Sequence, residues 1–142
     1  MAMNFHQSAI KTRFAVRFVQ AMKRLNKRRG VTTTDSYKRY RATRAAACAS
    51  MASAVGPQRA WSRAVLSKTK RRRFQAISRK RRLINPRRNL GFGQEEDLRG
   101  LVPGGKGMEY CSLLSETAHY IRCLQAQIQV MTDILHHSSS LN

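Results

Sequence analysis

Seven side chains near the C-terminal end of the sequence recur at alternating spacings of three and four residues. They are Leu114, Thr117, Ile121, Leu124, Ile128, Met131 and Leu135. This a/d pattern over three heptads predicts one helix, from about residue 108 to residue 135, with a single narrow apolar seam. Such a seam needs a facing helix, which either a second chain or the N-terminal helices of the same chain can supply. The two arrangements can coexist.

Apolar periodicity predicts four further helices. They cover residues 5–28, 37–55, 60–66 and 94–102. Asp35 or Ser36 can cap the second of these helices, and Gly56 followed by Pro57 ends it. Pro103 ends the fourth. No stretch shows a convincing strand pattern, so the predicted fold class is all-α.

The charge is divided unevenly along the chain. Residues 1–93 hold 25 Lys and Arg and one acid, Asp35, whereas residues 94–142 hold three basic residues and six acids. This asymmetry predicts a basic arm joined to a separate, nearly neutral module. Pro86 and Gly91 also oppose a continuous helix before the module. We expect four parts: an N-terminal basic helical region (1–66), a disordered basic linker (67–93), a helix-loop-helix (94–135) and a disordered tail (136–142).

The net charge of +21 predicts an anionic partner: nucleic acid, an acidic protein surface, an import receptor or an anionic membrane. Two basic clusters in the linker fit a bipartite nuclear localisation signal, so the predicted location is the nucleus. They are Lys70, Arg71, Arg72 and Arg73, followed by Arg79, Lys80, Arg81 and Arg82. The alternative interpretation of these clusters is a solvent-exposed charged stretch without a localisation function. The Arg-rich, acid-free first thirty residues also fit a mitochondrial transit peptide.

The sequence shows no pattern typical of a catalytic site, a metal site or a cofactor-binding site. Its four histidines do not converge, and His119 is expected on the outer face of its helix, in solvent. The three cysteines form neither a disulfide framework nor a zinc pattern. No apolar run approaches the roughly 18–20 residues of a membrane span, so no membrane partner is expected. We therefore expect a binding protein and not an enzyme.

Two sequence stretches resemble plant basic helix-loop-helix (bHLH) factors, and the resemblance covers residues 80–131. They are Leu101-Val102-Pro103-Gly104 and Glu116-Thr117-Ala118-His119-Tyr120-Ile121-Arg122-Cys123-Leu124. The upstream Ala-rich stretch and Trp61-Ser62-Arg63-Ala64 are similar to a narrower group, the atypical INCREASED LEAF INCLINATION-binding bHLH proteins and their ATBS-interacting-factor relatives. The resemblance implies half of a parallel four-helix bundle. Its dimer interface would comprise Leu98, Leu101 and Val102 together with the seven seam residues.

In typical bHLH proteins a His, a Glu and an Arg, each four residues apart, read the DNA site. The resemblance places these positions at Lys80, Ile84 and Arg88. Isoleucine cannot accept the hydrogen bond that a carboxylate takes from cytosine. Pro86 interrupts the same helix, and Tyr110 stands where a phosphate-contacting Lys is usual. Sequence-specific DNA binding should therefore be lost, whereas weak, salt-sensitive binding to nucleic acid remains possible.

These features together predict a regulator that heterodimerises with bHLH factors and represses them without binding DNA itself. The first helix of the module supplies little core, so we expect at most a weak homodimer. The resemblance further implies negative regulation of cell elongation in brassinosteroid signalling, and sequestration by a second, smaller helix-loop-helix protein. A rival interpretation is a general nucleic-acid-binding protein of ribosomal or chromatin type, in which the basic arm carries the function.

Overall fold

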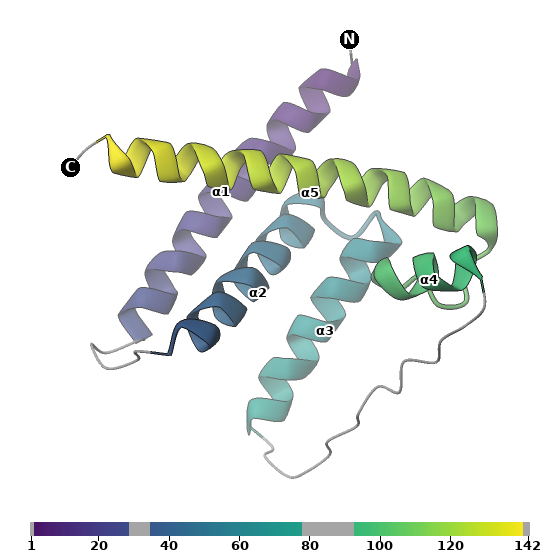
Figure 1. The fold of residues 1–142 in the computed structure, drawn as a ribbon, viewed down its shortest axis with the longest axis horizontal. Coiled ribbons are helices and arrows are strands. Elements are labelled where there is room, and N and C mark those ends of the chain that lie inside the picture. The colour runs from purple at the N-terminus through teal and green to yellow at the C-terminus, as the bar shows by residue number, and fades with distance from the viewer. Residues whose placement is uncertain (1, 29–34, 78–92, 141–142) are drawn as a thin grey trace.

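The computed structural model describes residues 2–28, 35–77 and 93–140, and these residues form five helices and no strand (Figure 1). The helices are α1 (Ala2–Arg28), α2 (Ser36–Val55), α3 (Ala60–Ile77), α4 (Gln94–Leu101) and α5 (Tyr110–Ser139). The predicted all-α class is confirmed for this part of the chain.

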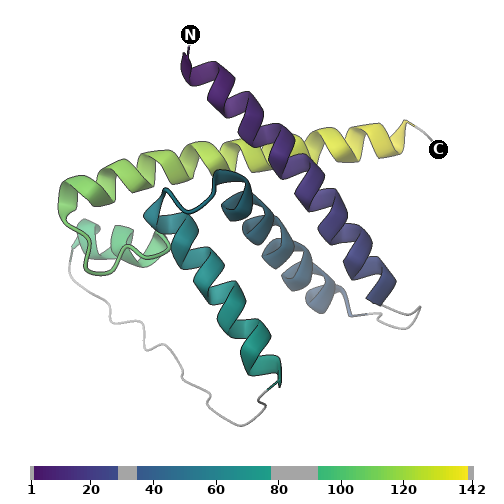
Figure 2. The same cartoon turned by 180° about the vertical axis from the view of Figure 1, so that it is seen from behind.

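The first three helices lie side by side, with α2 between α1 and α3, and α5 crosses over them (Figures 1 and 2). Phe14 and Phe18 of α1 are buried, and their rings stack 5.5 Å apart. They join a core with buried residues of α2 such as Ala47 and Met51. The many alanines of α2 allow both neighbouring helices to approach it closely. Each fully buried phenylalanine contributes about 1.5–3 kcal/mol relative to exposure.

The turns follow the local signals in the sequence. Asp35 caps α2 by accepting hydrogen bonds from the backbone N–H groups of Tyr37 (3.1 Å) and Lys38 (3.2 Å), as one of the two predicted capping residues. Gly56 ends α2 at a φ of 83°, in the region that favours glycine. The Ser62 hydroxyl is fully buried and donates to the carbonyl oxygens of Gly56 and Arg59, which fixes the turn into α3.

A compact loop joins α4 to α5. Arg99 donates hydrogen bonds to the carbonyl oxygens of Gly105 and Met108, and it pairs with Glu95 one turn earlier. Gly104, at a φ of 76°, lies so close to α3 that a Cβ atom there would come within 3.0 Å of the Ala64 Cβ. The loop therefore packs against the N-terminal helices. As expected of a short first helix, α4 buries none of its residues.

Two predicted boundaries are wrong. Helix α3 continues to Ile77, so residues 67–77 are helical and the disordered basic linker cannot begin at residue 67. These residues contain neither Pro nor Gly, and Lys, Arg, Gln and Ala are good helix formers, so charge alone was a poor sign of disorder. Helix α5 likewise continues through most of the predicted disordered tail, to Ser139. His136 and His137 lie in its last turn, where the helix dipole favours positive charge.

Candidate protein-interaction surface

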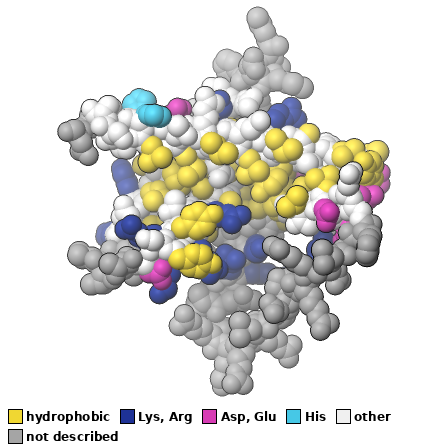
Figure 3. All heavy atoms as spheres, in the orientation of Figure 1, with side chains coloured by type: hydrophobic (Ala, Val, Ile, Leu, Met, Phe, Trp, Pro, Cys, Tyr) yellow, Lys and Arg dark blue, Asp and Glu magenta, His cyan; other side chains and the backbone are white. Residues whose placement is uncertain are grey.

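Helix α5 has two apolar faces. One face is buried against the N-terminal helices and includes Leu113, Cys123, Ala126 and Val130. The other face carries an apolar residue at every seventh position and remains exposed. We call this second set the α5 stripe: Leu114, Ile121, Ile128 and Leu135, with exposed fractions of 44%, 49%, 64% and 67%. Figure 3 shows hydrophobic side chains following α5 across one face of the molecule.

The ten predicted interface residues therefore do not form one surface. The stripe and Leu101, which is 75% exposed, are accessible. Val102 is only 4% exposed and belongs to the intramolecular core, so it is not accessible to a partner in this conformation. The other four residues are half-buried: Leu98 on α4, and Thr117, Leu124 and Met131 between the two faces of α5.

Helix geometry explains this division. In an α-helix with 3.6 residues per turn, positions seven apart drift slowly around the axis, so the a and d positions of a heptad lie on adjacent lines. In α5 the line of the stripe points to solvent, whereas on the line through Leu124 and Met131 both residues are half-buried and Met131 packs against the core. The seam is thus divided: one of its lines faces the helices of the same chain, and the other remains exposed.

The buried face of α5 is held by a cluster that surrounds Trp61, the single tryptophan, which is 1% exposed at the start of α3. The backbone N–H of Trp61 donates to Glu116 Oε2 (3.1 Å), and its indole Nε1–H donates to His119 Nδ1 (3.1 Å). The rings of Trp61 and Tyr120 lie 4.9 Å apart. We call these residues the α3–α5 clasp: Trp61, Glu116, His119 and Tyr120.

Glu116 has a second electrostatic role in the clasp. Its carboxylate lies at the N-terminus of α3, where free backbone N–H groups and the helix dipole favour a negative charge. Arg59, just before α3, approaches the same carboxylate at 3.7 Å. Glu116 therefore acts as a capping residue supplied by a different helix, and it ties the beginning of α3 to α5.

The prediction that His119 lies in solvent on the outer face of its helix is wrong. His119 is half-buried and uses Nδ1 to accept the tryptophan hydrogen bond, so this nitrogen carries no proton in the clasp. Cys123 lies one turn further along, with Sγ 3.6 Å from His119 Nδ1. Burial raises the pKa of the Cys123 thiol to about 11, which keeps it protonated and unreactive at neutral pH.

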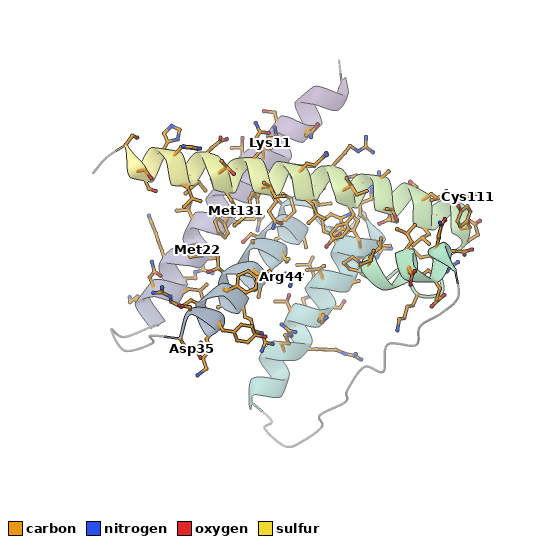
Figure 4. The ribbon with its side chains drawn as sticks, viewed as in Figure 1. Lys11, Met22, Asp35, Arg44, Cys111 and Met131 are labelled. Atoms are coloured by element: carbon orange, nitrogen blue, oxygen red, sulfur yellow. The ribbon has the colours of Figure 1, made fainter. Side chains whose placement is uncertain are left out.

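A polar contact also joins α1 to α5. Lys11 Nζ donates to Gln129 Oε1 at 2.6 Å. In Figure 4, Lys11 and Met131 lie near the crossing of these two helices. Contacts at both crossings therefore hold α5 with the stripe directed away from α1–α3.

The predicted localisation signal is described only in part. Lys70, Arg71 and Arg72 are exposed on the last turns of α3, a placement compatible with recognition by another protein. The side chain of Arg73 and all of Arg79, Lys80, Arg81 and Arg82 lie outside the described residues. The degenerate DNA-reading positions Lys80, Ile84 and Arg88 lie outside them too. Both interpretations stay predictions.

Two negative findings concern the described residues alone. Within residues 2–28, 35–77 and 93–140, no helix is both long enough and apolar enough to cross a membrane. The same part of the chain brings together no three His, Cys, Asp or Glu side chains in an arrangement that could hold a metal ion.

Comparison with known proteins places these helices in a family. Residues 7–73 match the family described as IBH1-like, N-terminal domain, so the match covers most of α1, all of α2 and most of α3. The chain is also 35% identical to the protein named Transcription factor IBH1 of Oryza sativa subsp. japonica, over 164 aligned positions that cover 90% of this chain and 79% of the relative. The protein of the same name from Oryza sativa subsp. indica shows the same identity and coverage.

No solved structure matches the chain. The family match lies entirely upstream of residues 80–131, which carry the sequence resemblance to bHLH proteins. The relatives nevertheless align over most of the chain, and their level of identity is sufficient to assign it. The chain belongs to the family of the plant transcription factor IBH1.

Proposed function

We propose that this transcription regulator is a repressor that pairs with DNA-binding bHLH proteins through the α5 stripe. The exposure of the stripe carries the proposal. Its four large aliphatic side chains are each at least 44% exposed and recur every seventh residue along one helix. A linear apolar patch of this kind on a soluble protein marks an interaction site, and heptad spacing suits a partner helix.

Support of α5 by the N-terminal helices explains how the chain could pair in spite of its weak first helix. In a typical bHLH dimer the two helices of each module build the bundle together. Here α4 buries no residue, whereas α1–α3 hold the opposite face of α5 through the core and the clasp. The stripe is thus presented on a preorganised helix, which reduces the entropic cost of pairing.

Repression follows from the proposed defect in DNA reading. By the resemblance to bHLH proteins, Ile84 occupies the position where typical members have a carboxylate that contacts a base. Pro86 opposes a continuous DNA-binding helix around it. A mixed dimer would then hold one competent basic helix instead of two, so its affinity for a palindromic site would fall. The positive charge of residues 1–93 would leave a weak affinity for any nucleic acid.

The setting of this activity is the nucleus, where the relatives' name as transcription factors implies action, and where the basic clusters of the chain would direct it. We propose in addition that the regulated process is cell elongation under brassinosteroid control, with a negative sign. This last step is supported by the resemblance to atypical plant bHLH proteins.

A gel-shift experiment tests the proposal. The wild-type chain is titrated into a plant bHLH activator bound to an E-box duplex, and we expect the shifted band to disappear without a slower band replacing it. An Ile84→Glu variant is run in parallel to restore the missing carboxylate. A slower, sequence-specific band with the wild-type chain would contradict the proposal, because the chain would then bind DNA within the complex. If an unrelated basic protein of similar charge removes the activator's shifted band equally well, positive charge alone would account for the loss.

A further inference from the structure

A second surface lies between α2 and α3, apart from the α5 stripe. It is a groove of about 580 Å³ lined by residues of α2, α3, the end of α4 and the following loop, together with Tyr120 of α5. This volume is within the range of ligand sites in proteins, roughly 300–1,000 Å³. We call the apolar part of its lining the floor, and this part includes Ala45, Ala64 and Val65. Two tyrosines at its mouth, Tyr37 and Tyr40, are 66% and 60% exposed.

The walls of this groove are strongly basic. Arg41, Arg44, Lys68 and Arg72 line it, and no Asp or Glu is among the described residues that do so. None of the four cations forms an ion pair within the part of the chain that the structure describes. In Figure 4, Arg44 lies between α2 and α3, and Figure 3 shows Lys and Arg side chains beside hydrophobic ones below α5. Four cations without acidic partners around an apolar floor favour an anionic, partly apolar ligand.

The chemistry of the groove favours a peptide over nucleic acid. Bases bind single-strand sites chiefly by stacking on open aromatic faces. The guanidinium of Arg41 already lies over the Tyr37 ring, 5.7 Å from its centroid. Tyr120 is half-buried with its ring against Trp61, so among the tyrosines that line the groove Tyr40, 60% exposed, is left as a single stacking platform. Successive bases of a nucleic-acid strand need several such platforms. The alanines and valine of the floor suit aliphatic or aromatic side chains, which a phosphate backbone lacks.

We propose that the groove between α2 and α3 binds an acidic segment of a partner protein, in which carboxylates alternate with large apolar side chains. The apolar side chains would lie on the Ala45, Ala64 and Val65 floor, while the carboxylates would pair with Arg44 and Lys68 from opposite walls. The site is separate from the α5 stripe and does not require helix-loop-helix pairing. A chain with a defective stripe would still bind such a segment.

Fluorescence anisotropy of the full-length chain tests this site. The probe is a short labelled peptide that alternates Asp or Glu with Leu or Phe, and the comparison peptide carries Asn and Gln in place of the acids. We expect the acidic peptide to bind and an Arg44→Glu/Lys68→Glu variant to weaken binding by about tenfold or more, because attraction becomes repulsion. The matched control is Arg13→Glu/Lys23→Glu, which changes two exposed residues of α1 by the same net charge. This control should change the affinity by less than about twofold.

Cysteine alkylation of the unmodified chain provides a second measurement that needs no variant. Cys48 lines the groove and is half-buried, whereas Cys111 is exposed at the beginning of α5. Bound acidic peptide should slow alkylation of Cys48 and leave that of Cys111 unchanged. Equal weakening by both double variants, or absence of Cys48 protection at saturating peptide, would overturn the proposal. Tighter, groove-dependent binding of oligothymidine than of the peptide would overturn it in favour of a nucleic-acid site.

Discussion

Removal of the Trp61 side chain should destabilise the whole molecule and not only one helix. Trp61 is 1% exposed, contacts the Tyr120 ring and donates a hydrogen bond to His119 across the junction of α3 and α5. Truncation of a buried tryptophan to alanine typically costs about 3–5 kcal/mol, and domains of this size have roughly 5–15 kcal/mol in total. Trp61→Ala should therefore lose between about a fifth and all of the stability. Trp61→Phe keeps a buried ring but leaves His119 Nδ1 without its donor, so we expect a smaller loss of about 1–2 kcal/mol.

Urea unfolding followed by circular dichroism at the helix band provides the assay, because the variants lack the only tryptophan fluorophore. With a slope of about 1–3 kcal/mol per molar urea, Trp61→Ala should move the midpoint by more than about 1 M. The control is Leu135→Ala, which truncates an aliphatic side chain that is 67% exposed on the stripe and should shift the midpoint little. A Trp61→Ala midpoint as close to wild type as that of Leu135→Ala would refute the clasp.

Three further predictions concern the same framework. Glu116→Gln should destabilise the fold by about 1–2 kcal/mol in urea unfolding, because a neutral amide loses the charged cap of α3 and the ion pair with Arg59. An unchanged urea midpoint would mean that the Glu116 carboxylate does not stabilise the start of α3. Burial raises the Cys123 pKa from 9.0 to about 11, so the stability that this thiol contributes should be complete below about pH 9 and lost as the pH rises towards 11. Cys123→Ala should remove that part of the pH dependence of the urea midpoint. A profile unchanged by this substitution would argue against burial of the thiol. Gly104→Ala and Gly107→Ala both place alanine at positive φ, which should lower the free energy of unfolding by about 1–2 kcal/mol each. In thermal unfolding Gly104→Ala should be the more destabilising, because its Cβ would press on Ala64. Equal destabilisation would show that the loop does not pack on α3.

The sequence predicted the helices well where local signals are strong. The cap at Asp35, the stop at Gly56 and the short α4 ending before Pro103 all follow from residue chemistry within one turn of each boundary. The basic stretch from residue 67 was harder, since like charges suggest disorder whereas Lys and Arg are intrinsically good helix formers. Local propensity outweighed charge repulsion there.

Which face of α5 would be buried could not be read from the heptad pattern. An apolar seam predicts that a helix will be covered, but the identity of the cover depends on contacts between residues more than fifty positions apart, such as Trp61 with Glu116. One signal was available: Glu116, His119, Tyr120 and Cys123 lie at i, i+3, i+4 and i+7, so they share one helix face. That face proved to be the one on which the tryptophan docks.

We propose that the α5 stripe pairs with a partner while the clasp holds the other face of the helix. The direct measurement is the affinity of the full-length chain for the helix-loop-helix region of a plant bHLH protein, by isothermal titration calorimetry, for wild type, Ile121→Glu and the outer-face control Ser115→Glu. Both positions are exposed, so neither change should shift the urea midpoint appreciably. We predict that Ile121→Glu weakens binding by about tenfold or more, equivalent to 1.4 kcal/mol, and that Ser115→Glu binds as wild type does. Equal affinities for all three chains would contradict the central claim.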